Sequence, residues 1–509
     1  MVWISSILLV AAIGALAYVY TPTYLRWYAL IGPLVIIGII DITQKSHAIR
    51  RNYPIIGNFR YMLEEIRPEI MQYFVETDTE GRPLNRIFRS LIYQRAKNVS
   101  DTTPFGTQMN VYENGYEWLE HSMYPLHHEQ IWADPRVNIG GPDCKNPYLA
   151  SLLNISAMSY GSLSKNAVMA LNKGAYIGGF AHNTGEGAIS PFHQKPRGDL
   201  IWQVGTGYFG CRTHDGHFDA DKFREKAQLE QVKMIEVKLS QGAKPGHGGI
   251  LPAGKNTEEI AAIRGVKPYT DVHSPPFHSA FKDAMGMMNF IAQLRDLSGG
   301  KPIGIKLCLG RKEEFEEILQ AMITSDIKPD FITIDGGEGG TGAAPVEFSN
   351  SLGTPLRDAI TYIHNQLIGY DLKKDIKIIA SGKIISGFDM ARTIALGTNA
   401  CNSARVMMLA VGCIQALKCN TNTSPTGVAT QDPKLYIGLV VEDKATRVAN
   451  FHRNTIESFV HLMSASGFQY PNDIRRKHIH RRISMDKTMT YEELYPSVEK
   501  GAFLSVPTD

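Results

Sequence analysis

Short apolar runs alternate with longer helical stretches along the chain from residue 152 onward. Eight runs have the β-rich, apolar character of buried strands: 152–158, 180–186, 200–207, 234–242, 302–310, 331–337, 376–382 and 400–408. Between most of them apolar residues recur at helical spacing, over 163–179, 281–299, 313–324, 354–367 and 388–397. This alternation is typical of repeated βα units that form a parallel sheet.

Eight such units fit a closed barrel better than an open sheet. An open, doubly wound sheet more often has fewer strands and a GxGxxG turn after its first strand, and no such turn follows the first run here. The sequence therefore predicts an α/β fold with a (β/α)8 TIM barrel over residues 151–432. The functional site of such a barrel lies at the C-terminal ends of its strands.

Two other segments flank the predicted barrel. Residues 43–150 mix helical spacing with irregular aromatic stretches, and we assign no chemistry to this pre-barrel segment. Residues 433–509 are predicted to form a helical C-terminal extension, because 444–467 have helical apolar spacing. The basic run Arg475–Arg482 is expected to be a solvated surface, or alternatively to contact the anionic inner leaflet of a membrane.

The chain begins with an apolar segment. Val2–Tyr20 is uncharged and nearly as long as the roughly 20 residues that cross a bilayer, and Trp27–Ile40 is a second apolar run with basic residues beyond it. No basic residue precedes the first run, which disfavours a cleaved signal peptide. We predict that residues 1–42 anchor the protein in the inner or cell membrane, as one transmembrane helix or, preferably, as a helical hairpin with the barrel in the cytoplasm.

Charge and cysteine content narrow the classes of partner. The 53 basic and 50 acidic residues give a net charge of +3, which is too balanced to indicate a nucleic-acid partner. The six cysteines lack the spacing of a disulfide framework, which favours a reducing compartment.

Glycine-rich strand ends are the strongest chemical signal. Residues 335–345, DGGEGGTGAAP, are too rich in glycine for a helix or strand unless the backbone approaches something closely. In many barrels the loops after the last two strands bind phosphate through backbone N–H groups. We therefore predict a phosphate site, for a phosphorylated cofactor or a phosphorylated substrate, at Ser381, Gly382, Lys383, Ala404 and Arg405.

Further polar residues follow the middle strands. Glu186, Gln241, Lys244 and Lys306 would place a carboxylate, an amide and two ammonium groups at the barrel mouth. Such a set could bind an acidic substrate or a flavin ring. His214, Asp215 and His217 are the best metal-ligand candidates, but no further ligand lies at suitable spacing, so no metal site is predicted.

Five motifs, in chain order, resemble the FMN-binding synthase domain of the large subunit of glutamate synthase: SAMSYGSLS, HNTGEG, QGAKPGHGG, DGGEGGTGAAP and GVATQDP. The apolar start resembles the stand-alone, membrane-anchored members of that family. The resemblance implies an FMN-dependent oxidoreductase that delivers hydride from reduced flavin to 2-iminoglutarate, which forms from 2-oxoglutarate and ammonia. The flavin carries the chemistry and the protein supplies position and charge.

The same resemblance implies roles for individual residues. Glu186, Gln241 and Lys244 would be catalytic, and Tyr208, Gln241 and Lys244 would bind the amino or oxo acid substrate. The implied FMN-binding residues are Met158, Ser159, Gly161, Lys306, Gly337, Gly339, Gly340, Thr341, Ser381, Gly382, Lys383, Ala404 and Arg405.

Two departures put the substrate in question. Tyr208 in TGYFG stands where the family has an arginine that pairs with a carboxylate of 2-oxoglutarate, and His247 stands where the family usually has glutamate. The chain also begins with MVWISSILLV instead of the catalytic cysteine of a glutaminase domain. Ammonia would then be free or supplied by another subunit, or the reaction would run in the oxidative direction.

The segment after the last strand bears on electron supply. The family holds a three-iron cluster with cysteines spaced C-x5-C-x4-C, whereas here Cys413 and Cys419 are followed by Ser424. Because serine seldom replaces a thiolate in such clusters, we expect no iron–sulfur cluster and two cysteines that serve as small buried hydrophobes. The electron partner stays open between ferredoxin, an NAD(P)H-linked reductase and quinone. Two alternatives also stay open: an amino-acid or amine dehydrogenase that reduces quinone, and a catalytically silent flavin-binding subunit of a membrane complex.

Overall fold

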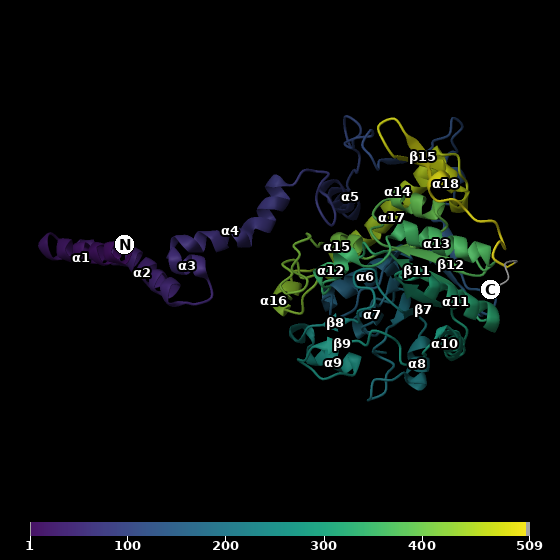
Figure 1. Ribbon diagram of the computed structural model, residues 1–509, viewed down its shortest axis with the longest axis horizontal. Helices are drawn as coiled ribbons and strands as arrows, with labels where there is room; N and C mark the ends of the chain where they lie inside the picture. The colour runs from purple at the N-terminus through teal and green to yellow at the C-terminus, as the bar shows by residue number, and fades with distance from the viewer. Residues whose placement is uncertain (1, 505–509) are drawn as a thin grey trace. The chain divides into compact units, whose positions relative to one another are not determined.

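Eight parallel strands close into a barrel in the computed structural model, which describes residues 2–504 (Figure 1). The strands are β4 (Leu153–Ile155), β5 (His182–Asn183), β6 (Leu200–Val204), β7 (Val232–Lys238), β10 (Ile303–Leu307), β11 (Phe331–Asp335), β12 (Lys377–Ser381) and β13 (Ala400–Ser403). They follow one another around the barrel in chain order, and β13 pairs with β4 to close it. All eight predicted runs and the TIM-barrel fold are confirmed.

Helices connect the strands on the outside. They are α6 (Lys165–Gly178), α7 (Pro191–Gln194), α8 (Ala220–Ala227), α9 (Glu258–Arg264), α10 (Ala284–Leu297), α11 (Lys312–Ser325), α12 (Val346–Ser351), α13 (Leu356–Gly369), α14 (Gly387–Ala395) and α15 (Arg405–Val411). A small hairpin of β8 (Ile250–Leu251) and β9 (Val272–His273) lies in the β7–β10 connection. The eighth predicted strand was too long, because its apolar end belongs to α15, and a short apolar run fits either element.

The barrel interior has an apolar floor. Inward side chains near the N-terminal strand ends, including Met234, Phe331 and Ile379, pack with Ile139 of a hairpin formed by β2 (Arg136–Ile139) and β3 (Tyr148–Ser151). A Cβ on Gly304 would lie 2.5 Å from the Phe331 ring, so glycine is required on the neighbouring strand. The floor therefore closes the barrel on the side opposite its polar mouth.

A buried carboxylate occupies the layer above the floor. Glu236, 1% exposed, accepts hydrogen bonds from Asn183 Nδ2 at 2.8 Å, Gln203 Nε2 at 2.5 Å and Thr333 Oγ1 at 2.7 Å. A buried charge is tolerated where hydrogen bonds satisfy it. Because inward side chains recur at every second residue of a strand, the next inward residues of β7 and β11 are Lys238 and Asp335, at the mouth.

Two long helices from outside the barrel region cover one side of it. The predicted C-terminal helix is confirmed as α17 (Val441–Ala465), which follows the short α16 (Pro433–Tyr436) and packs on α6 and on α5 (Arg86–Lys97). A Cβ on Gly174 of α6 would lie 2.6 Å from the Val448 side chain, so this glycine permits close helix approach. Asn454 Nδ2 also donates to Arg95 O at 3.0 Å, which joins α17 to α5.

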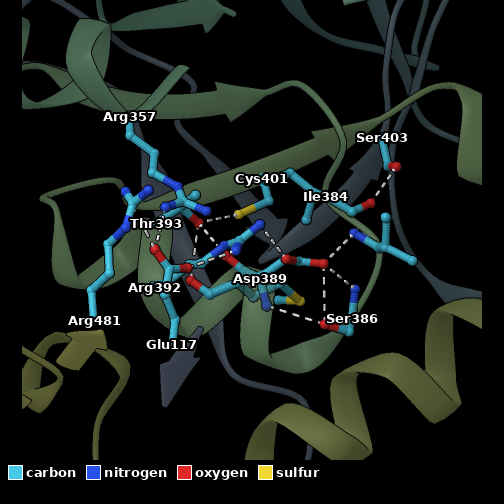
Figure 2. A network of polar contacts seen from close by, with 12 residues as sticks. Glu117, Arg357, Ile384, Ser386, Asp389, Arg392, Thr393, Cys401, Ser403 and Arg481 are labelled. Atoms are coloured by element: carbon cyan, nitrogen blue, oxygen red, sulfur yellow. Dashed lines mark hydrogen bonds and ion pairs between the residues drawn. The ribbon is translucent and has the colours of Figure 1, made fainter. Parts of the chain in front are cut away.

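A three-stranded sheet joins both flanking segments to the barrel. It contains β1 (Glu117–Leu119), β14 (Ile479–Arg482) and β15 (Thr488–Thr490), followed by α18 (Tyr491–Leu494). Figure 2 shows Glu117 of β1, whose side chain is 4% exposed, between three arginines. Arg357 of α13 and Arg392 of α14 donate hydrogen bonds to it, and Arg481 Nη1 of β14 lies 3.8 Å away.

The basic run 475–482 is therefore only partly the solvated surface that the sequence predicts. Arg476 is 4% exposed and donates to Tyr495 O at 2.5 Å and to Asn365 Oδ1 at 2.9 Å. Arg482 donates to Val111 O at 3.0 Å. These guanidinium groups hold the C-terminal segment together because each satisfies buried or half-buried carbonyl oxygens.

Residues up to Asn85 form a separate unit, so the unit boundary falls inside the predicted pre-barrel segment. Its helices are α1 (Val2–Val19), a 3-10 turn (Pro22–Trp27), α2 (Tyr28–Thr43), α3 (Ala48–Asn52), α4 (Ile56–Ile70) and a π-helical turn, η2 (Met71–Val75). The Tyr28 hydroxyl donates to Val10 O at 2.8 Å, so α2 folds back on α1. Among the described residues, Pro22–Thr43 is the one helix whose length and apolar composition would allow it to cross a bilayer, properties that signal sequences and core helices share.

Candidate active site

Two groups of charged residues meet at the barrel mouth. Lys238, the last residue of β7, is the register partner of Lys306 on β10, so these two inward lysines lie side by side. Lys238 belongs to a group around Glu186, which follows β5. Lys306 belongs to a group around Asp335, the last residue of β11.

Glu186 is surrounded by cations. Its Oε1 lies 3.0 Å from Lys238 Nζ, and both side chains are largely buried. Burial would raise the pKa of Glu186, but Lys238, Arg264 and Lys244 together hold it below its usual value. A Cβ on Gly249 would lie 2.2 Å from Glu186 Oε1, so the loop after β7 must have glycine there to pass the carboxylate. Glu186 is thus an ionised carboxylate at ordinary pH.

Lys244 and Arg264 are nearly inaccessible cations of the same group. Lys244, 2% exposed, donates to Ala343 O at 3.1 Å, and burial lowers its pKa to about 8. Arg264, 4% exposed, donates to Tyr160 O at 3.0 Å, and burial lowers its pKa to about 10 while Glu186 opposes that shift. The three cations exceed the single carboxylate in charge, so an acidic ligand would complete the charge balance here.

Tyr208 lies beside this group but not in open space. It is 0% exposed, and its hydroxyl is 3.0 Å from His278 Nδ1 and 3.1 Å from Ala280 N. His278 Nε2 is 2.8 Å from Lys238 O, which can only accept, so Nε2 carries the proton. Burial lowers the pKa of His278 to about 4, so the ring is neutral and Nδ1 accepts from Tyr208. The Tyr208 hydroxyl is therefore paired within the protein, and the contact with substrate that the sequence predicts for it stays a prediction.

Gln241 and His247 are half-buried in the glycine-rich loop after β7. The backbone of this loop is fixed by Asp335, whose Oδ2 accepts from Gly242 N at 2.8 Å. A Cβ on Gly242 would lie 1.8 Å from Gly336 O, so two of the glycine-rich loops pack directly on each other. Some of the glycines at the strand ends are therefore needed for packing between loops, whereas the sequence analysis attributed them to a ligand that approaches the backbone.

The second charged group centres on Asp335. Lys306 Nζ lies 3.7 Å from Asp335 Oδ2, and Ser381 Oγ donates to Asp335 Oδ1 at 2.7 Å. Ser156 Oγ is 3.1 Å from Ser381 Oγ, which extends the chain of hydrogen bonds to the end of β4. The predicted residues Lys306 and Ser381 are thus brought together through Asp335, which sequence reasoning did not select.

The predicted phosphate-site residues gather where β12 and β13 end. Arg405, the first residue of α15, donates to Glu338 O at 2.7 Å, and burial lowers its pKa while Asp335 and Glu338 act against the shift. Lys383 has φ +51 and adds a second cation in the adjacent loop. A guanidinium, an ammonium and glycine backbone at two strand ends make a donor set that suits a phosphate group.

The loop after β4 contacts the loop after β5. A Cβ on Gly185 would lie 2.6 Å from Ser159 N, so glycine permits this approach beside Glu186. Met158 is 8% exposed, and Gly161 has φ +105, a conformation that glycine adopts without strain. These three predicted cofactor residues thus border the Glu186 group. Gly337, Gly339, Gly340 and Thr341 lie in the loop that follows β11, and a Cβ on Gly340 would lie 3.0 Å from Arg405 Cδ.

The cysteine-containing loop lies after α15. Burial raises the pKa of Cys413 to about 11, with Cys419 adding to the shift, so the Cys413 thiol is protonated at ordinary pH. Ser424 is 6% exposed, and a Cβ on Gly342 would lie 3.1 Å from Cys419 Cβ, so the loop packs against the turn after β11. Within residues 2–504, no three or more His, Cys, Asp or Glu side chains gather as a metal-binding group.

Sequence reasoning missed Lys238, Arg264, His278 and Asp335. Lys238 and Asp335 could have been found, because each lies in the middle or the C-terminal half of a predicted strand, near the end where a barrel places its site, and is the last residue of the observed strand. Arg264 and His278 lie in the long β7–β10 connection, and no local pattern marks them. His214 and Asp215 are fully exposed on another loop, 3.8 Å apart.

Comparison with known proteins explains why these motifs occur together. The conserved region in glutamate synthase matches residues 121–469. The chain belongs to the glutamate synthase family. The barrel, its glycine-rich loops and the lysines at its mouth all lie within the matched residues.

Individual relatives define the chain's position in the glutamate synthase family. The chain is 40% identical to the glutamate synthase large subunit-like protein YerD of Bacillus subtilis, covering 87% of this chain and 91% of that protein. It is 34% identical to the archaeal glutamate synthase [NADPH] of Methanocaldococcus jannaschii, over 65% of this chain and 62% of that protein. Among solved structures, a mutant flavocytochrome b2 with benzoylformate superimposes with a TM-score of 0.44 at 12% identity, covering 86% and 90% of the two chains. A likeness of that strength carries no weight for function.

Proposed function

We propose that this protein is an FMN-dependent oxidoreductase of the glutamate synthase type that acts at a CH–NH2 or imine carbon of an amino or oxo acid. The observation that carries the proposal is the buried group around Glu186, where Lys238, Lys244 and Arg264 outnumber one carboxylate at the barrel mouth. Such a group suits an acid whose carboxylate supplies the missing negative charge. The similarity to the archaeal glutamate synthase [NADPH] supports the same substrate class.

The two charged groups at the barrel mouth would have different roles, with the Glu186 group binding substrate and the Asp335 group binding FMN. Lys244 and Arg264 would bind carboxylate, and Gln241 would orient the nitrogen-bearing carbon. Glu186, which is ionised and hydrogen-bonded to Lys238, would accept or hold a proton from an amine. The barrel floor and the Glu236 layer beneath exclude water from below.

FMN would be held at the Asp335 end. Arg405 and Lys383, with the backbone from Ser381 to Gly382, would bind its phosphate, and Lys306, fixed by Asp335, would lie near its ring. When bound, FMN supplies hydride transfer, which no protein side chain can provide. We further propose that α1 and α2 anchor the protein in the cell membrane with the barrel in the cytoplasm, and that electrons come from a separate donor, such as a ferredoxin, an NAD(P)H-linked reductase or quinol.

The test uses the full chain purified in detergent. The proposal predicts a flavin absorption band at about 450 nm. It also predicts that 2-oxoglutarate with ammonium reoxidises the dithionite-reduced protein under anaerobic conditions. Bleaching of the oxidised band by glutamate alone would instead indicate a dehydrogenase that works in the oxidative direction.

The test variant is Lys244→Met. The matched control is Lys282→Met, which changes an exposed lysine. Loss of substrate-dependent reoxidation in the Lys244 variant alone supports the site. A protein that retains no flavin, or that behaves identically in both variants, contradicts the proposal.

A further inference from the structure

Helix α4 presents an apolar face that the unit around it does not cover. Ile56, Phe59, Leu63, Ile66 and Ile70 recur at intervals of three and four residues, so they share one side of the helix. Their exposed fractions are 71%, 58%, 53%, 41% and 37%. Beyond the helix, Tyr73 and Phe74 of η2 are exposed by 51% and 85%. An apolar stripe of this length, about 22 Å for 15 residues, is unusual on a surface in contact with water.

Two arginines and one glutamate of α4 border this face. Arg60 lies one turn from Ile56, and Arg67 one turn from Leu63, whereas Glu69 follows Ile66 by three residues. Arg60 Nη2 also pairs with Glu64 Oε1 at 2.8 Å, one turn along the helix. Glu65 lies on the opposite side. Long basic side chains at such a border can keep their alkyl stems in apolar surroundings while the guanidinium reaches lipid phosphates.

The start of α4 is fixed to the end of α2. Asp41, near the end of the apolar helix and 3% exposed, accepts hydrogen bonds from Ile55 N at 2.9 Å and from Asn58 Nδ2 at 2.5 Å. A Cβ on Gly57 would lie 2.9 Å from Ile49 O, so α4 also packs closely on α3. Because these contacts connect the start of α4 to the end of α2, α4 begins close to the point where α2 would leave a bilayer.

We propose that α4 lies in the headgroup region of the membrane that holds α1 and α2, with its apolar face toward the acyl chains. This inference rests on the membrane anchoring proposed above and adds a second, interfacial attachment. An amphipathic helix with basic residues at its border and a fixed link to a membrane span has the features of an interfacial helix. Attachment at two points would hold the unit that ends at Asn85 more firmly to the membrane than the apolar segment alone.

A second copy of the chain is the other occupant with suitable chemistry. The three-four spacing of the apolar residues also fits a coiled-coil seam, but α4 spans only about two heptads, fewer than such a seam needs. The observations therefore favour lipid.

The experiment places an environment-sensitive fluorescent amino acid singly at Leu63, Glu65 or Ile36 in the full chain, reconstituted in vesicles of phosphatidylcholine and phosphatidylglycerol. Nitroxide-labelled lipids with the label near the headgroup or near the acyl-chain end serve as quenchers. Leu63 is the position under test, Glu65 is the matched position on the opposite side, and Ile36 of α2, 59% exposed, reports on anchoring.

The proposal predicts blue-shifted emission and roughly twofold quenching at Leu63 by the shallow quencher, and none at Glu65. Quenching at Ile36 by the deep quencher without quenching at Leu63 would overturn the interfacial helix and leave the anchor intact. Absence of quenching at both positions would overturn the anchor as well. Blue-shifted emission at Leu63 that no lipid quencher affects would show that protein, and not lipid, covers the face, and would also overturn the proposal.

Discussion

Replacing Tyr208 by phenylalanine tests whether this residue supports the site or binds substrate. The change removes one hydroxyl that donates to His278 Nδ1 and accepts from Ala280 N, at 3.0 and 3.1 Å. The ring keeps its contacts with Phe218 and His278, at centroid distances of 5.8 and 5.4 Å, so little packing is lost. The cost is therefore that of leaving one buried acceptor and one buried donor unpaired.

Each unpaired buried group costs about 1–3 kcal/mol, so two of them give a local destabilisation of about 2–6 kcal/mol. Since 1.4 kcal/mol corresponds to a factor of ten, the Ala280 amide should exchange its hydrogen about 30- to 20,000-fold faster. Hydrogen–deuterium exchange with mass spectrometry on peptides that span Ala280 measures this change in the full chain. His278 loses the hydrogen bond at its Nδ1 in the same step, so the segment between β9 and α10 should loosen as a unit.

Tyr269→Phe is the matched control, because Tyr269 also has positive φ, +57, but is 63% exposed. Its substitution should leave exchange at Ala280 unchanged. If Tyr208→Phe leaves that exchange unaltered and instead weakens binding of a substrate acid, Tyr208 contacts substrate directly and the supporting role argued from its hydrogen bonds is wrong.

Three further outcomes are expected. Arg405→Ala should cost about 1.5–3 kcal/mol of flavin binding, at least tenfold in affinity, whereas the exposed Arg311→Ala should leave flavin content unchanged in a fluorescence titration. Because the pKa of Lys244 is lowered to about 8, its ammonium is lost as pH rises through that value, so affinity for an acidic substrate should fall above pH 8 and the fall should disappear in Lys244→Arg. Anaerobically purified protein should contain flavin with substoichiometric iron, and a cluster detectable by EPR only in Ser424→Cys; a full cluster in the unaltered protein would refute this expectation.

The barrel could be predicted from sequence because its strands are buried on both faces and therefore appear as apolar runs. Phe331–Asp335 and Lys377–Ser381 show this directly. The outer sheet could not be predicted in the same way. Strand Glu117–Leu119 is three residues long and half-buried, and its partner lies more than 300 residues later, so neither periodicity nor length marks it.

The candidate site was predictable where a residue stands at a strand end and not where its role depends on a distant partner. Lys306 and Ser381 were selected from position alone, and Asp335, which joins them, follows the same rule. The orientation of Tyr208 depends on His278, which lies 70 residues later in a connection without regular pattern. Tyr208 stands where the family has arginine, and this replacement suggested a different substrate. In the structure, the Tyr208 hydroxyl hydrogen-bonds His278 and Ala280 and thereby joins the loop after β6 to the segment before α10.

The Glu117 cluster imposes an order on folding during synthesis. The carboxylate leaves the ribosome early, while its partners Arg357 and Arg392 follow 240 and 275 residues later and Arg481 comes near the end of the chain (Figure 2). Because a buried carboxylate needs its cations, β1 stays in contact with water until the residues up to Arg481 have been synthesised. A chain cut short before β14 would leave β1 unpaired, so proteases should cleave such a fragment faster than a chain that includes β14.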